Sequence, residues 1–373
     1  MTLAFLFLAY AIIAFAAHLV SCLMVGRRAL KADLPTDDLP PVTIVRPISQ
    51  ADPYLLQTLA SSFAVRGDTE IIFCAARESD PAVTVARALI AHHPQARLLT
   101  GDAPISQNPK LNNCVKGWHA AKHDVVVFVD SNVMLPEDYL SRMLGAWDDG
   151  CGMVTSPPAG ERPENFWATV ECAFLNTHQA RWQMFADEIG MGFAQGKNLM
   201  FRKSILDPLG GIEALAREPA EDAAATRALR NAGYHIRLAP VPFPQPLGKR
   251  SSRQFWSRQV RWAKLRRATF PALYLPEILA GGALPVLAFA AGAALLGSSP
   301  WLAALAFVSI WIVTELALAR TLNWPGGFRM ALAIAVRDVM IPMVWIAGFT
   351  GNGFEWQGHR MSASRASPAP ESP

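Results

Sequence analysis

Hydrophobic and polar residues follow two different patterns along this chain. Residues 3–25 and three later stretches are almost wholly apolar, whereas residues 42–248 alternate between short apolar runs and longer segments with helical spacing. The later apolar stretches are 278–296, 301–318 and 330–349. Each is long enough, or nearly so, to cross a bilayer. The pattern therefore predicts one N-terminal and two to three C-terminal membrane helices, with a large mixed region between them.

The first apolar stretch has the charge flanks of a retained membrane anchor. No cation precedes it, whereas Arg27, Arg28 and Lys31 follow it directly. It is also longer than the apolar core of a cleaved signal peptide. Because positive charge collects on the cytoplasmic side of a span, we expect the chain to emerge there. Further basic residues at 264–267 precede the next apolar block, so the whole mixed region is expected on the cytoplasmic side.

The last apolar stretch carries Arg337 and Asp338 near its centre. Each charge costs about 2.5–3.5 kcal/mol at the middle of a membrane helix unless it is paired or faces protein. Neighbouring residues on one helix do not face each other, so we expect partners elsewhere or a re-entrant segment; a structural polar pair within the helix is the alternative. A re-entrant segment would keep the tail on the cytoplasmic side. The end of the tail, rich in Ser, Pro and Ala, is expected to be disordered.

The mixed region alternates strands and helices. Short apolar runs predict strands at 42–45, 70–75, 97–99, 125–129, 152–155, 197–201 and 235–238. Helical spacing and capping signals predict helices at 53–63, 82–92, 109–122, 136–147, 166–184 and 222–231. Such alternation is typical of an α/β fold with a mostly parallel sheet and helices on both faces. In that architecture, ligands bind beyond the carboxyl ends of the strands.

Composition narrows the function classes. Of 373 residues, 51% are hydrophobic and only 17% are charged, which is too apolar for an average soluble protein. The net charge of +4 is small and gathers near the membrane borders, which favours lipid headgroups over nucleic acid as partners. The five cysteines show no paired spacing, so neither a disulfide framework nor a zinc site is expected. Nothing in the sequence implies an obligate protein partner.

Three aspartates lie at the ends of predicted strands or at the starts of predicted helices in the mixed region. Asp130 directly follows the strand at 125–129, a place suited to a divalent cation on a nucleotide diphosphate, although it could equally satisfy loop amides. Asp80 precedes Pro81, so it could cap a helix or accept hydrogen bonds from a nucleobase or ribose. Asp222 lies in the first turn of a helix, where the dipole favours it, and is our candidate for a general base.

A basic segment precedes the second apolar block. On a helix, Arg258, Arg261 and Trp262 would share one face. Guanidinium groups bind phosphate in a bidentate manner, and a Trp suits the bilayer interface. The stripe therefore fits a phosphate beside a membrane, or simply anionic lipid.

Taken together, these residues resemble a known family. The three aspartates followed by Arg258, two variable residues, Arg261 and Trp262 resemble inverting, processive-type nucleotide-sugar transferases. Further runs, among them Asn-Pro-Lys-Leu-Asn-Asn at 108–113 and Ala-Glu-Asp at 220–222, look like the ceramide glucosyltransferase family. The resemblance covers roughly 42–267 and continues more loosely at 336–338 and 356–360.

The resemblance implies a GT-A (Rossmann-like) catalytic domain that moves a hexose from a UDP-sugar with inversion. By resemblance, Asp80 would contact the uridine. Asp130 would contact the sugar diphosphate and a divalent metal, Mg²⁺ or Mn²⁺. Asp222 would be the general base of a single in-line displacement.

Other positions inherit donor and acceptor roles from the family. Arg258, Arg261 and Trp262 would lie at the donor diphosphate and at the opening for the acceptor. His178, with Trp262, would contact the acceptor headgroup, or else be a satisfied interior histidine. The donor pocket near the diphosphate would be lined by Asn108, Lys110 and Asn113.

Two departures from the family pattern concern the donor site. Asn132 stands where many related transferases carry a second carboxylate; ceramide-type members lack it too. Metal affinity would then be weak, although Asn132 could supply a neutral oxygen. Residues 45–49, Val-Arg-Pro-Ile-Ser, replace the family's usual Lys-Pro-Leu-Lys-Gly, so base or ribose contacts would differ.

The expected protein is a multi-pass membrane enzyme whose catalytic domain lies on the cytoplasmic side, in a bacterium at the inner membrane. We expect an anchor at 1–26, a linker at 27–41, the catalytic domain at 42–248, a basic amphipathic interfacial helix at 249–272, a membrane region at 273–350 and a tail at 351–373. The favoured reaction transfers glucose to the primary hydroxyl of ceramide. The alternatives are transfer, for example of N-acetylglucosamine, to a hopanoid polyol or diacylglycerol, and a non-catalytic membrane sensor of nucleotide sugars.

Overall fold

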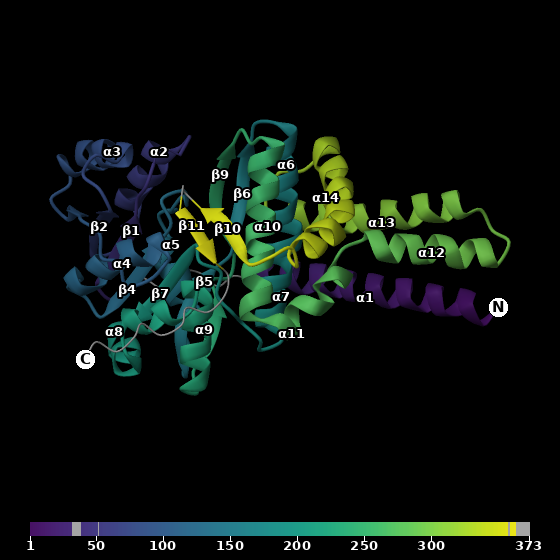
Figure 1. Ribbon diagram of the computed structural model, residues 1–373, viewed down its shortest axis with the longest axis horizontal. Coiled ribbons are helices and arrows are strands. Elements are labelled where there is room, and N and C mark those ends of the chain that lie inside the picture. The colour runs from purple at the N-terminus through teal and green to yellow at the C-terminus, as the bar shows by residue number, and fades with distance from the viewer. Residues whose placement is uncertain (32–38, 51, 357–358, 363–373) are drawn as a thin grey trace. The chain divides into compact units, whose positions relative to one another are not determined.

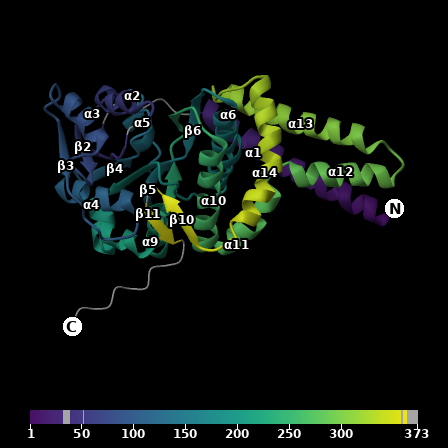
Figure 2. The ribbon, with the colours of Figure 1, turned by 45° about the horizontal axis from the view of Figure 1, so that its top comes forward.

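The computed structural model describes residues 1–31, 39–50, 52–356 and 359–362 (Figures 1 and 2). The chain divides into two compact units. The membrane unit comprises Met1–Lys31, Gly160–Phe185 and Leu247–Asn352. The α/β unit comprises Ala32–Ala159, Ala186–Pro246 and Gly353–Pro373. The chain thus enters each unit more than once.

A seven-stranded sheet forms the centre of the α/β unit, in the order β3-β2-β1-β4-β7-β5-β8. β7 is antiparallel to β4 and β5, whereas every other neighbouring pair is parallel. This confirms the expected mostly parallel α/β sheet. The strands are β1 (Val42–Pro47), β2 (Thr69–Ala75), β3 (Ala96–Thr100), β4 (Val125–Val129), β5 (Cys151–Ser156), β7 (Asn198–Arg202) and β8 (His235–Leu238).

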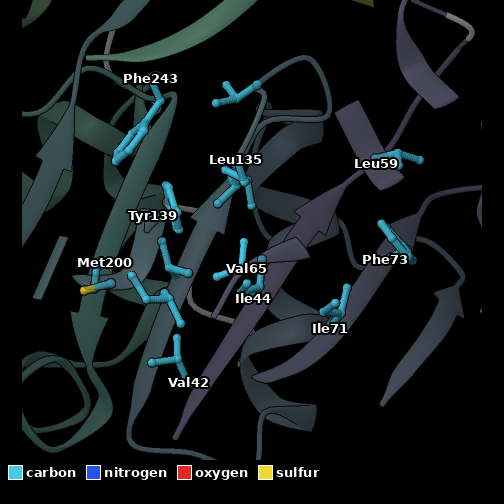
Figure 3. Close-up of a cluster of buried hydrophobic side chains, with 14 of the residues drawn as sticks. Val42, Ile44, Leu59, Val65, Ile71, Phe73, Leu135, Tyr139, Met200 and Phe243 are labelled. Carbon is cyan, nitrogen blue, oxygen red and sulfur yellow. The ribbon is translucent and has the colours of Figure 1, made fainter. Parts of the chain in front are cut away.

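The central strand β4 is apolar throughout because both faces of the sheet are covered. In β4, Val125, Val127 and Val129 point to one hydrophobic cluster, shown in Figure 3, and Val126 and Phe128 point to the other. The helical elements of this unit are α2 (Leu55–Ala60), η1 (Ser61–Ala64), α3 (Pro81–Ile90), α4 (Pro109–Ala120), α5 (Tyr139–Leu144), α8 (Lys203–Leu206), η3 (Asp207–Leu209), η4 (Ile212–Arg217) and α9 (Glu221–Asn231).

The sequence pattern predicted most of these elements and missed the proline-containing strands. β6 (Pro158–Pro163) pairs with β9 (Phe243–Gly248), and both strands cross the boundary between the units. A second two-stranded sheet pairs β10 (Gly353–Trp356) with β11 (His359–Ser362) in antiparallel orientation. Prolines in β6 and β9 remove amide donors, which fits two-stranded ribbons better than a central strand. The expected disorder at the end of the tail concerns 363–373, outside the described residues.

The membrane unit is helical. Three helices, α1 (Thr2–Leu30), α13 (Pro300–Thr321) and α14 (Phe328–Ala347), are long and apolar enough to cross a membrane. The segment Pro271–Ala280 and the following helix, α12 (Ala283–Leu295), form a pair bent by 50° that could be one further span. The remaining helical elements are α6 (Phe166–Ala173), the π-helix η2 (Phe174–Ala180), α7 (Arg181–Glu188), α10 (Ser252–Thr269), α11 (Pro271–Tyr274) and η5 (Leu275–Ala280).

Within the membrane unit, α14 runs in a different direction from the other apolar helices. α1, α12 and α13 lie side by side, with the N-terminus beside the loop that joins α12 to α13 (Figures 1 and 2). α14 crosses them steeply and packs against α6 and α10. It is one continuous helix through Arg337 and Asp338, and the re-entrant placement of 330–349 stays a prediction. The bend of 50° lies earlier in the chain, between Ala280 and Ala283.

The charges of α14 have partners within the membrane unit. Both terminal nitrogens of the buried Arg337 bond the carboxylate of Glu315 on α13, at 2.7 and 2.8 Å. The same guanidinium donates to Thr177 at 2.7 Å, and it also bonds Asp338 at 2.7 Å. The prediction of partners elsewhere is therefore confirmed. The expectation that Arg337 and Asp338 cannot pair is wrong, because the long guanidinium arm folds back along the helix.

Candidate functional site

Four segments of the α/β unit converge at one edge of the sheet. β4 ends there, and the loop after it carries Asp130. Because β7 is antiparallel to β4, its beginning lies at the same edge, where Val129 is opposite Asn198. The backbone N–H of Asp130 donates to the carbonyl of Lys197, which fixes the two loops together. The first turns of α4 and α9 complete this edge, as the contacts below establish.

Asp130 is bound by two lysines. Lys110 Nζ lies 2.8 Å from Asp130 Oδ1, as an ion pair rather than an aligned hydrogen bond. Lys197 Nζ donates to Asp130 Oδ2 at 2.7 Å and to the side-chain oxygen of Asn132 at 3.2 Å. Burial alone would raise the pKa of the Asp130 carboxyl, but the two ammonium groups outweigh burial and hold that pKa below its usual value. Asp130 is therefore ionised at neutral pH.

The first turn of α4 joins this pair to α9. Asn108 caps α4 by accepting hydrogen bonds from the amides of Lys110 and Leu111, and Pro109 occupies the first helical position. The Asn108 side chain also donates to Glu221 at 2.6 Å. Lys110 Nζ lies 2.8 Å from the same carboxylate and donates to the carbonyl of Gly196. Lys110 thus connects α4, α9 and the two loops.

Asp222, the candidate base, lies beside the cluster formed by Asp130, Lys110, Lys197 and Glu221. Its two oxygens accept hydrogen bonds from the backbone N–H groups of Gly196 at 2.7 Å and Ala223 at 2.8 Å. Burial and the neighbouring charge of Glu221 raise the pKa of Asp222 to about 7, although Lys110 and the two amides oppose this. A carboxyl group with a pKa near neutrality can take up a proton from an alcohol in the transition state and release it afterwards.

Glycine at position 196 allows this close approach. A Cβ added there would lie 2.9 Å from Glu221 Oε1, 3.2 Å from Lys110 Nζ and 3.4 Å from Asp222 Oδ2. Even a methyl group at this position would crowd Glu221 and Lys110, whereas its contact with Asp222 would be ordinary. The segment before β7 approaches the site through its backbone.

Arg46 supports the loop that carries Asp130, and its side chain is inaccessible to a ligand. Its guanidinium group is completely buried and donates to the carbonyls of Asp130 and Val133 at 2.8 and 2.7 Å. It also bonds Thr58 and Ser62. The departure from the family pattern at this position thus has a structural role in this chain.

Two of the expected donor-site residues have other contacts. Asp80 caps α3 by accepting from the amide of Ala82, and it also accepts from the amide of Gln50, both at 2.9 Å. The capping alternative is therefore realised, and the uridine contact stays a prediction. The buried Asn113 accepts from Lys116 at 2.8 Å. Both side chains thus bond to groups other than those around Asp130.

The basic stripe lies on α10 of the membrane unit. Ser251 and Gln254 form a capping box at the start of this helix. Arg258 donates to the buried carboxylate of Glu171 on α6 at 2.5 Å, and Arg250 lies 3.3 Å from the same carboxylate. Trp262 packs against the hydrophobic cluster formed with α6 and α14, and Arg261, on the same face, is half-buried. One guanidinium of the stripe is thus already bound to protein, and the diphosphate role of the stripe remains a prediction.

His178 lines a small pocket within the membrane unit. His178 belongs to the π-helix η2, and such irregular turns are frequent at functional sites. His178 is only 6% exposed, and its Nδ1 has no hydrogen-bond partner. Burial and the charges of Arg337, Arg181 and Arg266 lower the pKa of His178, so its ring is neutral. The pocket is lined by Phe174, His178, Gln179, Arg266, Glu277, Ile341, Val344 and Trp345.

The cluster around Asp130 does not suit the expected divalent cation in its present arrangement. Mg²⁺ and Mn²⁺ bind through carboxylate oxygens, but each Asp130 oxygen is already paired with an ammonium group. The oxygen of Asn132, the other expected ligand, accepts from Lys197.

Two residues, one in each unit, have contacts that the sequence did not reveal. Lys197 directly precedes β7 in the α/β unit, and a lone lysine before a strand carries no signal of its own. Glu171 is hidden within the aromatic-rich helix α6, where its burial and its pairing with Arg258 depend on tertiary structure. Of the expected donor residues, Asn108, Lys110, Asp130 and Asp222 come together in the α/β unit.

The chain is similar to several known proteins. The chain is 28% identical to ceramide glucosyltransferase 1 of Caenorhabditis elegans over 340 residues, covering 88% of this chain and 73% of that protein. It is 29% identical to ceramide glucosyltransferase 3 of the same organism over 246 residues, covering 65% of this chain and 54% of that protein. A mannosyltransferase from Pyrobaculum calidifontis, solved with GDP-Man and Mn²⁺, is 18% identical with a TM-score of 0.49, covering 89% of this chain and 99% of that one. The sequence profile of glycosyl transferase family 21 matches residues 6–368, and the chain therefore belongs to this family.

Proposed function

We propose that this protein transfers a hexose, with glucose favoured, from a UDP-sugar to the primary hydroxyl of ceramide, with inversion. The observation that carries the proposal is the cluster in which Asp222, with a pKa of about 7, lies beside the charged groups of Lys110, Asp130 and Glu221. Family membership supports a glycosyl transfer, and the apolar helices of the membrane unit support a lipid acceptor.

The proposed reaction is a single displacement at the anomeric carbon. The acceptor oxygen forms a bond to this carbon while its proton passes to the carboxylate of Asp222. The bond between the anomeric carbon and the diphosphate oxygen breaks at the same time, and its electron pair stays with the departing UDP. Negative charge grows on UDP, so cationic side chains at the diphosphate stabilise the transition state more than the ground state. Each Asp222 oxygen accepts one amide bond and retains a lone pair for the proton.

For the acceptor, we propose the pocket that contains His178. One wall is apolar, with Phe174, Ile341 and Val344, and the other offers Gln179 and the ion pair between Arg266 and Glu277. A neutral histidine with an unbonded ring nitrogen suits a hydroxyl or amide of a lipid headgroup. Ceramide carries both groups next to its alkyl chains.

One experiment tests the identity of both the sugar donor and the lipid acceptor, by analysis of the products. The purified protein in lipid nanodiscs would be incubated with UDP-glucose, UDP-galactose or UDP-N-acetylglucosamine against ceramide, diacylglycerol or a hopanoid polyol. We expect hexosylceramide as the main product, identified by mass. A product on diacylglycerol or the polyol but none on ceramide would exclude the proposed acceptor, and no transfer with any pair would favour a nucleotide-sugar sensor.

We also propose that α1, α12 and α13 cross the membrane while α14 lies along its surface. α14 crosses the other three helices steeply and exposes an apolar face with Phe328, Leu332, Val339, Met343 and Ile346. Such a face suits burial at the boundary between headgroups and acyl chains. Three crossings leave the residues after α14 on the same side as the α/β unit, to which Gly353–Pro373 belongs.

Cysteine labelling tests this topology. All five native cysteines are buried, so a single added cysteine can be followed with a membrane-impermeant maleimide in oriented vesicles. Asp102→Cys in the α/β unit and a cysteine appended after Pro373 are expected to label from the cytoplasmic side. Ser298→Cys, between α12 and α13, should label only from the opposite side. Labelling of Ser298→Cys and the appended cysteine from the same side would contradict this topology.

A further inference from the structure

Lys197 is the cation of the donor site with hydrogen-bonding capacity to spare. An ammonium group has three N–H donors, and Lys197 uses two of them, on Asp130 and Asn132. Its side chain is 17% exposed, so a ligand can reach it. Lys110, in contrast, faces three oxygens, those of Asp130, Glu221 and Gly196. Lys197 is therefore the better placed of the two to contact an incoming anion.

A divalent cation would have to compete with these lysines. To reach either oxygen of Asp130, it would displace an ammonium group or stand beside it, and both carry positive charge. Asn132 supplies a neutral oxygen instead of the second carboxylate that would offset this repulsion. Of the two other acids nearby, Glu221 is held by Lys110 and Asn108, and each oxygen of Asp222 accepts a hydrogen bond from a backbone amide.

Metal-ligating side chains gather elsewhere in the α/β unit. Within the described parts of the chain, the one group of three such side chains close enough to share an ion is Asp148, Cys151 and His235. Cys151 and His235 begin β5 and β8, at the edge of the sheet opposite Asp130. That group cannot serve the donor site.

We propose that the ammonium groups of Lys197 and Lys110 take the place of a divalent cation at Asp130, so that UDP-sugar binds and reacts without metal. This inference rests on the proposed function of the same site. Asp130 holds the two lysines in position, and Lys197 bonds the diphosphate directly. The negative charge that develops on departing UDP is met by fixed protein cations, which need no reorganisation during the reaction.

Calorimetric titration with UDP, in EDTA and in Mn²⁺, tests the proposal on the full-length protein. The wild type should bind UDP with the same affinity in both buffers. Lys197→Met should bind UDP more weakly in EDTA by about 10- to 100-fold, the usual value of a hydrogen bond to a charged group. Adding Mn²⁺ should recover part of this loss, because the variant frees an oxygen of Asp130. Electron paramagnetic resonance should detect Mn²⁺ bound with UDP to the variant but not to the wild type.

Two variants serve as controls. Lys197→Arg keeps the charge and should keep tight UDP binding in EDTA. Lys203→Met removes a lysine at the other end of β7, which bonds the carbonyl of Trp118, and should leave UDP affinity unchanged. If the wild type binds UDP only with Mn²⁺, or if Lys197→Met binds like the wild type in EDTA, the proposal is overturned while the proposed function survives. Absence of UDP binding in both buffers would refute the two together.

Discussion

Replacing Asp222 with asparagine should lower kcat/KM for glycosyl transfer by about 10²- to 10⁴-fold, the usual contribution of a general base. The amide cannot accept the acceptor proton. The variant keeps the shape of the side chain but loses one of the two bonds to the amides of Gly196 and Ala223, because an amide has a single acceptor oxygen. Steady-state transfer to ceramide measures the effect. UDP affinity and the melting temperature, measured in parallel, separate it from misfolding.

The pH profile gives a second signature of the same base. Asp222 acts only when deprotonated, so with its pKa of about 7 kcat/KM should fall roughly tenfold per unit below that pH and level off above it. Glu221→Gln removes the negative charge that helps to raise this pKa, so the acidic limb should move to lower pH. If Asp222→Asn turns over like the wild type, or keeps its acidic limb, another group is the base.

Replacing Arg337 with methionine should destabilise the membrane unit by about 3–5 kcal/mol, the usual cost of removing one partner from a buried ion pair. The substitution would leave the carboxylates of Glu315 and Asp338 without their guanidinium partner in a buried setting. It would also remove the bond to Thr177 that links α14 to the π-helix. Reversible unfolding with SDS in mixed micelles, followed by tryptophan fluorescence, measures the change in free energy.

Two further variants isolate the buried charge as the cause. Arg320→Met, at the exposed end of α13, makes the same chemical change and should alter the free energy of unfolding by less than about 0.5 kcal/mol. Adding Glu315→Gln to Arg337→Met should restore part of the lost stability by removing one orphaned charge. Equal losses for Arg337→Met and Arg320→Met would show that the network around Arg337 contributes nothing of its own.

The sequence was most informative where periodicity and capping act locally. An uninterrupted apolar run predicted β4 to the residue, and Asn108 with Pro109 predicted the start of α4. The aspartates at 130 and 222 could be selected because strand ends and helix starts concentrate chemistry in parallel sheets. Their convergence, with Lys110 between them, followed from the fold class.

Features set by long-range contacts could not be predicted. Lys197 acquires its role only because β7 runs antiparallel to β4, which brings it beside Asp130. The sequence showed residues 45–49 only as a departure from the family pattern, whereas the structural role of Arg46 depends on four hydrogen bonds to distant residues. Hydropathy also cannot predict the direction of α14. An apolar helix of that length has the hydropathy of a membrane span whether it crosses the membrane or lies along its surface.

The most direct measurement is the anomeric configuration of the lipid product, determined by NMR after incubating the wild-type protein with UDP-glucose and ceramide. The sugar of UDP-glucose is α-linked. A single displacement assisted by Asp222 inverts this centre, so the account predicts β-glucosylceramide, formed by the wild type and lost in Asp222→Asn. An α-linked product would contradict a single displacement with Asp222 as its base.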